Sequence, residues 1–246
     1  NRVLMVGIHG FGRIGKTTTT KAVYNIIANH FKGSSFLEKV REQSRTNDGI
    51  IQLQEEILFE ITRDRNLKVN NISRGINVIK ERLRWKRVLL VLDDVDKPNQ
   101  IENLLGDYKC LAPGSRILIT TRDKHVLNTL EKGPLVYEVG QMDRLEALEL
   151  FSLHAFQTSK PKEDYSNLAK QIICYANGLP LALKIIGSDL CGKSIHEWKS
   201  ALEKYKNILQ EKLKISYDGL ERTENDIYLN VACFFSSFQS IVTYFE

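Results

Sequence analysis

The sequence predicts an α/β protein in which a parallel sheet flanked by helices is followed by a helical module. Three observations predict this fold class. Short apolar runs alternate with helical patterns up to residue 139. A glycine-rich GxxxxGK[ST] motif lies between the first predicted strand and the first predicted helix. Beyond residue 139 the strand pattern stops, and only helical patterns follow.

Five short apolar runs predict the strands of the sheet. They lie at residues 3–8, 36–40, 88–92, 115–121 and 135–139. Residues 88–92 are five consecutive apolar side chains, a pattern typical of a strand that is buried on both faces of a parallel sheet.

Helices are predicted wherever apolar residues recur every three to four positions. Between the strands these segments are residues 16–30, 50–61, 72–83 and 98–105. In the second half of the chain they are residues 143–154, 164–175, 180–190, 195–205 and 224–234.

Composition narrows the class of protein without naming a function. The chain has 246 residues, of which 42% are hydrophobic and 26% charged, as in ordinary globular proteins. Its net charge of +5 is spread along the chain, so no basic tail for nucleic acid or membrane is indicated. None of the four cysteines forms a CxxC pair, which favours a reduced, intracellular compartment. No apolar run reaches the roughly 18 residues of a membrane span.

The strongest chemical signal is the segment GFGRIGKT at residues 10–17. Glycines let the backbone curl so that successive N–H groups point at phosphate oxygens, and the following helix adds its positive end. Lys16 would reach the β- and γ-phosphates, and the hydroxyl of Thr17 would ligate Mg²⁺. The alternative, a merely flexible glycine turn, leaves the Lys-Thr pair unexplained. The residues expected to hold the nucleotide here are Gly10, Gly12, Gly15, Lys16, Thr17 and Thr18.

A second signal is the pair of carboxylates that ends the apolar strand LLVLDD. Ligands of open parallel sheets bind at the carboxyl ends of the strands. Asp93 is therefore expected to hold Mg²⁺, directly or through water, and Asp94 to polarise an attacking water. The alternative is a solvated strand end or a helix N-cap.

Two further segments carry weaker signals. Arg122 follows the apolar strand ILITT at the same edge and would read the terminal phosphate, unless it forms a surface ion pair with Asp123. Pro180 opens a helix in the segment GLPLAL, and nothing in its chemistry demands more than helix initiation.

The order of these motifs, GxxxxGKTT, LLVLDD, GSRILITTRD and GLPLAL, resembles the NB-ARC module. This module is the nucleotide switch of plant disease-resistance proteins and of apoptotic protease-activating factors. The segments FLEKVRE, EALELF and LKISYDGL resemble the plant subfamily that carries a TIR domain, as does the final aspartate of LDDVD. The resemblance runs from residue 3 to about residue 235.

The resemblance implies a P-loop NTPase with three parts: a nucleotide-binding α/β domain at residues 1–139, a helical subdomain at 140–206 and a partial winged-helix subdomain at 207–246. It implies ADP at rest, ATP when active, Mg²⁺ as the metal and slow hydrolysis rather than rapid turnover. It assigns the metal to Thr17 and Asp93, the catalytic role to Asp94 and the sensor role to Arg122. It places Pro180 against the base and ribose.

The resemblance also implies partners and a location. These are TIR and leucine-rich-repeat domains of the same receptor, an oligomer on activation, and a cytoplasmic or also nuclear location. Two alternatives remain: a constitutive P-loop ATPase and a nucleotide-regulated nucleic-acid-binding regulator, although no basic stripe supports nucleic acid as a partner.

The sequence departs from the family pattern at several points. Arg13 stands in the phosphate loop where the family usually has glycine. Residues 236–246 do not resemble the expected continuation, and the family's MHD motif and upstream adenine-contacting segment are missing. We therefore expect a piece of a longer protein that binds nucleotide weakly.

Overall fold

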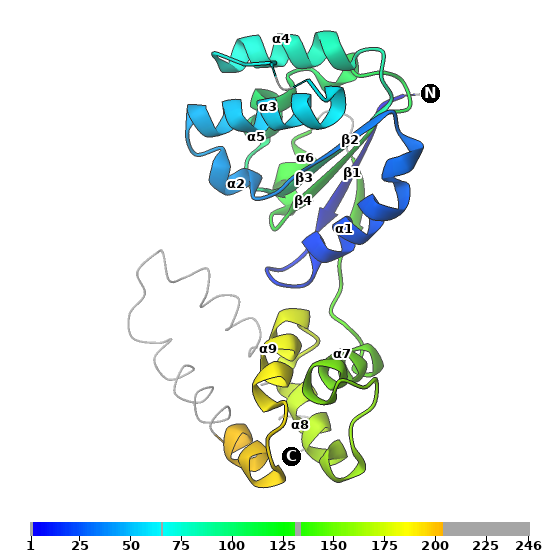
Figure 1. Ribbon diagram of the computed structural model, residues 1–246, viewed down its shortest axis with the longest axis vertical. Coiled ribbons are helices and arrows are strands. Elements are labelled where there is room, and N and C mark those ends of the chain that lie inside the picture. The colour runs from blue at the N-terminus through cyan, green and yellow to red at the C-terminus, as the bar shows by residue number, and fades with distance from the viewer. Residues whose placement is uncertain (1, 65, 131–133, 204–246) are drawn as a thin grey trace. The chain divides into compact units, whose positions relative to one another are not determined.

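The computed structural model describes residues 2–64, 66–130 and 134–203. The chain divides into two compact units, which are described separately below (Figure 1). The first contains residues 1–11 and 15–139, and the second contains residues 12–14 and the chain from residue 140 onward. Within the described residues, no helix combines the length and the apolar composition that crossing a membrane requires.

The first unit is built on one five-stranded parallel sheet, which confirms the predicted fold class. Along the sheet the strand order is β2-β3-β4-β1-β5. Every crossover between parallel strands needs a long connection, and helices supply most of these connections. The strands are β1 (Leu4–His9), β2 (Gly33–Leu37), β3 (Val88–Val95), β4 (Arg116–Thr121) and β5 (Leu135–Glu138).

The central strand β3 shows why the sheet carries helices on both faces. Leu89 and Val91 pack into the cluster on the side of helix α1 (Lys16–Ile27), while Leu90 and Leu92 pack into the larger core on the other side. All four side chains are buried, as the unbroken apolar run predicts. The strand therefore contributes to two separate hydrophobic layers.

The larger core lies between the sheet and the helices opposite α1 (Figure 1). Their amphipathic faces supply its side chains, and Leu53, Ile57 and Ile79 are fully buried in it. The helices of this side are α2 (Val40–Gln43), α3 (Asn47–Thr62), α4 (Ile72–Leu83), α5 (Pro98–Leu105) and α6 (Lys124–Asn128). Two 3₁₀ turns complete the unit, η1 (Ala28–His30) and η2 (Tyr108–Cys110).

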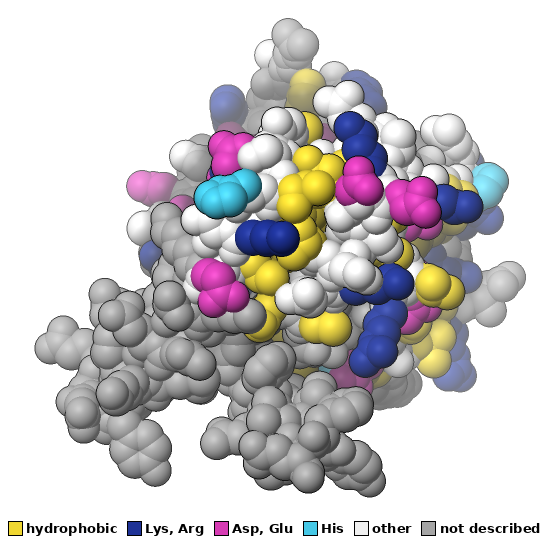
Figure 2. All heavy atoms as spheres, turned by 90° about the horizontal axis from the view of Figure 1, so that it is seen from below, with side chains coloured by type: hydrophobic (Ala, Val, Ile, Leu, Met, Phe, Trp, Pro, Cys, Tyr) yellow, Lys and Arg dark blue, Asp and Glu magenta, His cyan; other side chains and the backbone are white. Residues whose placement is uncertain are grey.

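The second unit is helical over its described residues. It comprises α7 (Arg144–Phe156), η3 (Glu163–Tyr165), α8 (Ser166–Ala176), α9 (Pro180–Leu190) and a further helical segment at residues 195–203. Its core is centred on Trp198, whose indole N–H donates to the backbone oxygen of Leu190 at 3.0 Å. Figure 2 shows a run of apolar side chains on one face of the molecule, bordered by charged ones.

Most predicted elements lie where the sequence places them, but one strand is shifted. The strand predicted at residues 36–40 occupies Gly33–Leu37, and Val40 instead begins α2. Lys39 adopts φ 53°, a left-handed conformation that turns the chain from strand to helix. The short helices α2 and α6 were not expected, and the helix predicted at residues 224–234 lies outside the described residues.

Candidate nucleotide-binding site

The predicted phosphate loop connects β1 to α1 at the carboxyl end of the sheet. Its backbone enters the left-handed region of φ at Gly10 (153°), Arg13 (65°) and Gly15 (102°). Gly15 occupies the N-cap position of α1, and no side chain caps this helix end. Because the first N–H groups of a helix have no intrahelical partner, this end is available to an anion. Arg13, the departure from the family pattern, adopts a backbone conformation that costs a non-glycine residue about 1–2 kcal/mol.

The side chain of Lys16 is buried and folds back onto its own loop. Its Nζ donates to the carbonyl oxygens of Gly10 at 2.7 Å and Phe11 at 2.8 Å. Burial is the main reason that the pKa of Lys16 falls to about 8, and the positive charge of Arg122 lowers it further. The nearby carboxylates of Asp93 and Asp94 oppose this shift. A buried ammonium that is held by two neutral carbonyls is suited to exchange them for phosphate oxygens.

Asp93 is the centre of a hydrogen-bonded group that joins three elements. The hydroxyl of Thr17 donates to its two carboxylate oxygens at 2.9 and 3.0 Å. The hydroxyl of Thr120, near the end of β4, donates to Asp93 Oδ1 at 2.6 Å. Asp93 and Thr120 are both buried. This arrangement fixes one carboxylate beside one hydroxyl at the start of α1.

Asp94 is turned toward different partners by an irregularity in β3. The pairing of β3 with β4 shifts register between Leu92 and Val95, so one extra residue stands on β3. Asp94 adopts φ 60°, and its N–H donates to Thr120 Oγ1 at 2.8 Å. Its carboxylate forms ion pairs with Arg41 of α2 at 3.1 Å and with Arg122 at 3.4 Å.

The structure pairs Arg122 with Asp94 rather than with Asp123, the partner in the alternative interpretation. Its guanidinium pairs with Asp94, whereas Asp123 caps α6 by accepting a hydrogen bond from the N–H of His125 at 2.8 Å. Among the described residues, Arg122 therefore points toward the site rather than toward its chain neighbour. The side chain is 41% exposed, so a ligand can reach it.

The remaining predicted residues have different surroundings. Thr18 is exposed in the first turn of α1, and Gly12 is buried in the loop. Pro180 is the first residue of α9, in the second unit, so its role against the nucleotide stays a prediction. The first unit thus brings together Lys16, Thr17, Asp93, Asp94 and Arg122.

Two residues of this cluster were missed by sequence reasoning. Thr120 lies inside the strand run ILITT, where its hydroxyl gives no local signal, although a polar residue near a strand end at this edge was a hint. Arg41 lies four residues after β2 in a short helix that no periodicity predicts.

The chemistry of these groups fits a nucleotide with a magnesium ion. Mg²⁺ takes oxygen ligands and usually keeps several waters, so one carboxylate and one hydroxyl are a suitable protein contribution. The carboxylate of Asp93 and the hydroxyl of Thr17 are already adjacent. Lys16 and Arg122 are the cations that would face the phosphates.

A parallel sheet of this order, with a glycine-rich loop between its first strand and first helix, defines a P-loop nucleotide-binding fold. Within this class, residues 1–161 match the NB-ARC domain family. The chain belongs to this family, as its resemblance implied.

The relatives are plant disease-resistance proteins. The chain is 46% identical over 238 residues to "Disease resistance protein RUN1" of Vitis rotundifolia, and 41% identical over 245 residues to "TMV resistance protein N" of Nicotiana glutinosa. These matches cover 95% of this chain but only 18% and 21% of the relatives. The chain thus spans about a fifth of the length of these proteins.

Solved structures support the fold from a greater distance. One is the "Structure of Drosophila ORC bound to DNA", with a TM-score of 0.58 and 12% identity, covering 90% of this chain and 65% of the other. Another is Cdc6p from Pyrobaculum aerophilum, with a TM-score of 0.55 and 14% identity, covering 96% and 74%. At this identity the likeness concerns the fold alone.

Proposed function

We propose that this chain is the ADP/ATP-binding switch of a plant intracellular immune receptor, with ADP bound at rest and ATP bound when active. The observation that carries the proposal is the placement of buried Lys16 at the base of the phosphate loop, beside the Thr17–Asp93 pair. This arrangement offers a cation to the phosphates and oxygen donors to Mg²⁺.

In this proposal the switch is a shift between two packings of the chain, biased by one phosphate group. Arg122 is the residue that would distinguish ATP from ADP. Asp94 is the proposed catalytic group, and its ion pair with Arg41 would compete with the orientation of an attacking water, in keeping with slow hydrolysis. Pro180 is proposed to pack against the base and ribose.

The rest of the receptor enters only as a proposal. Relatives are about five times longer than this chain, and we propose TIR and leucine-rich-repeat domains in the full-length protein, assembly into an oligomer on activation, and a cytoplasmic or also nuclear location.

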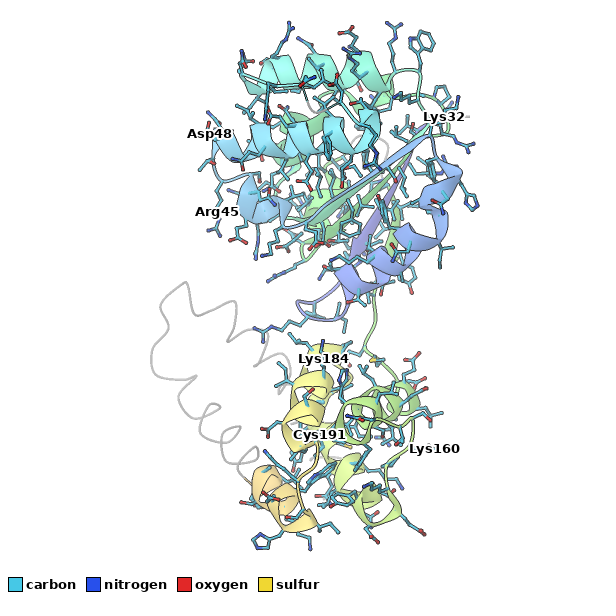
Figure 3. All side chains as sticks on the ribbon, viewed as in Figure 1. Lys32, Arg45, Asp48, Lys160, Lys184 and Cys191 are labelled. Atoms are coloured by element: carbon cyan, nitrogen blue, oxygen red, sulfur yellow. The ribbon has the colours of Figure 1, made fainter. Side chains whose placement is uncertain are left out.

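The test is direct binding of ADP and of Mg²⁺-ATP to the 246-residue chain, measured by calorimetry. We expect Lys16→Ala to weaken the affinity for ADP at least tenfold, because the buried cation would face the phosphates. Lys32→Ala is the matched control, because Lys32 is exposed and directly precedes β2, at the edge of the sheet opposite the phosphate loop (Figure 3). Equal binding by wild type and Lys16→Ala would overturn the proposal.

Two further results separate this proposal from its alternatives. Asp93→Ala should leave ADP binding unchanged but weaken the binding of Mg²⁺-ATP, because Asp93 would hold the Mg²⁺ that accompanies ATP. Steady hydrolysis above about 1 s⁻¹ would instead indicate a constitutive ATPase. Strongly salt-dependent DNA binding would indicate a nucleic-acid-binding regulator.

A further inference from the structure

Asp94 has two cationic partners that come from different parts of the chain. Arg41 Nε lies 3.1 Å from Asp94 Oδ2, and Arg122 Nε lies 3.4 Å from Asp94 Oδ1. Each arginine therefore engages a different oxygen of the same carboxylate. Arg41 is provided by α2, whereas Arg122 follows β4.

The two arginines differ in exposure and in the groups near them. The side chain of Arg41 is 29% exposed, and its neighbour Val40 is fully buried in the core, which anchors α2. The side chain of Arg122 is 41% exposed, and its charge reaches Lys16 strongly enough to lower the pKa of that lysine. Arg122 is thus the more exposed partner, and its charge acts on the lysine of the phosphate loop.

A terminal phosphate would compete with Asp94 for Arg122. Phosphate carries more charge than a carboxylate and offers a guanidinium several acceptor oxygens. When Arg122 turns to the phosphate, Asp94 loses one of its two cations. A partly buried carboxylate without a cation beside a bound anion is unfavourable, so the second arginine determines how easily Arg122 is released.

We propose that Arg41 is a positioning residue for nucleotide discrimination: it keeps Asp94 paired when Arg122 moves to the terminal phosphate, and it thereby favours ATP over ADP. The inference rests on the proposed nucleotide site. ADP has no γ-phosphate, so Arg122 stays paired with Asp94. Arg41 therefore contributes little to the binding of ADP. The contribution of Arg41 to ATP binding passes through Asp94.

The test measures the affinities of ADP and of the non-hydrolysable Mg²⁺-β,γ-imido-ATP on the 246-residue chain. Arg41→Gln should weaken the ATP analogue about three- to tenfold and change ADP by less than twofold. Arg45→Gln is the matched control: Arg45 lies two residues beyond α2, is exposed, and has its side chain on the outside of the unit (Figure 3). It should leave both affinities unchanged.

A double-mutant cycle identifies the route of the effect. In an Asp94→Asn background, Arg41→Gln should change the affinity of the ATP analogue by less than twofold, because no carboxylate remains to be neutralised. A direct contact between Arg41 and the phosphate would keep the full effect in that background. Arg41→Lys, which retains the charge, should recover part of the lost affinity.

The outcomes of this experiment are distinct. Equal weakening of ADP and of the ATP analogue by Arg41→Gln would overturn the inference, as would an undiminished effect in the Asp94→Asn background. No effect of Arg41→Gln on either ligand, with an unchanged far-ultraviolet circular dichroism spectrum, would overturn it as well. Failure of the wild-type chain to bind either nucleotide would instead refute the proposed function.

Discussion

The hydroxyl of Thr17 donates to both carboxylate oxygens of Asp93, at 2.9 and 3.0 Å, across 76 residues of chain. Thr17 is the second residue of α1 and Asp93 lies near the end of β3, so the pair fixes the start of a helix against the edge of the sheet. Both residues were expected at one metal site, and the fold brings them together because strand ends of a parallel sheet share an edge.

The pKa of Lys16 predicts a pH dependence of nucleotide binding. Since this pKa is about 8 in the free protein, the ammonium becomes neutral as the pH rises through 8. Bound phosphate favours the protonated form, so the affinity for ADP should be nearly constant below pH 7.5 and fall about tenfold between pH 7 and pH 9. Calorimetric titration at several pH values measures this slope.

A charge-retaining variant controls for other effects of alkaline pH. Arginine stays protonated throughout this range, so Lys16→Arg should bind with an affinity that is independent of pH between 7 and 9. Loss of fold does not explain the expected decline. The folded pKa lies below the unfolded value, so the contribution of this lysine to stability increases as the pH rises from about 8 to 10.5. A flat wild-type profile would contradict the prediction.

The sequence predicts regular elements more successfully than the contacts of the site. Helices α5 and α9 begin and end at their predicted residues, because a proline opens each of them and apolar spacing marks the rest. Strand β2 begins with Gly33 and two serines, so its first half carries no apolar signal. The buried Ser35 depends on tertiary packing that no local pattern reports.

The ion pairs of Asp94 could not be predicted from neighbouring residues in the sequence, because they too depend on tertiary structure. A one-residue shift in strand pairing and a left-handed backbone at Asp94 decide which way its carboxylate points. Both features depend on β4 rather than on the residues next to Asp94. Arg41 was therefore unassigned until the fold placed α2 at the same edge.

Thr120 is expected to stabilise the arrangement of both aspartates. Thr120→Val would remove the acceptor of the Asp94 N–H and one of the two hydroxyl donors to Asp93 Oδ1. We expect the free energy of unfolding to fall by about 1–3 kcal/mol, as for other unsatisfied buried polar groups, measured by urea denaturation. Thr120→Ser keeps the hydroxyl, so its free energy of unfolding should fall clearly less than that of Thr120→Val. A loss for Thr120→Ser as large as that for Thr120→Val would show that the methyl group matters as much as the hydroxyl, and would contradict the prediction.

Gly49 is predicted to be required for packing α3 against α2. A Cβ atom at this position would lie 1.8 Å from the backbone oxygen of Gln43, the last residue of α2. Alanine favours a helix by about 1 kcal/mol over glycine. The overlap involves backbone atoms, however, and we expect the free-energy cost of moving them to exceed this gain. Gly49→Ala should lower the free energy of unfolding by about 1–2 kcal/mol.

Gly140→Ala is the control for this substitution. Among the described residues, no atom outside residues 139–141 lies within 4 Å of a Cβ at Gly140, so the unfolding free energy of Gly140→Ala should stay within about 0.5 kcal/mol of that of wild type. If Gly49→Ala proved as stable as Gly140→Ala, α2 would be free to move away from α3.

The two tryptophans differ in burial, so we expect their replacement to differ in its effect on stability. Trp198 is buried, with its ring 5.7 Å from that of Phe151 and 4.9 Å from that of Tyr165. Trp198→Ala should destabilise the second unit by about 3–5 kcal/mol. Trp85 is 77% exposed, and the guanidinium of Arg84 lies over its ring, so Trp85→Ala should cost less than about 1 kcal/mol. Denaturant titration followed by circular dichroism compares them.

The most direct test of the central claim is chromatographic identification of the nucleotide released when the purified, heat-denatured chain is analysed beside Lys16→Ala. In our proposal, nucleotide retention depends on Lys16, which is buried at the phosphate loop. The account predicts ADP in the wild-type preparation and none in the Lys16→Ala preparation. Equal amounts of nucleotide in the two preparations, or none in either together with no binding of added ADP, would contradict it.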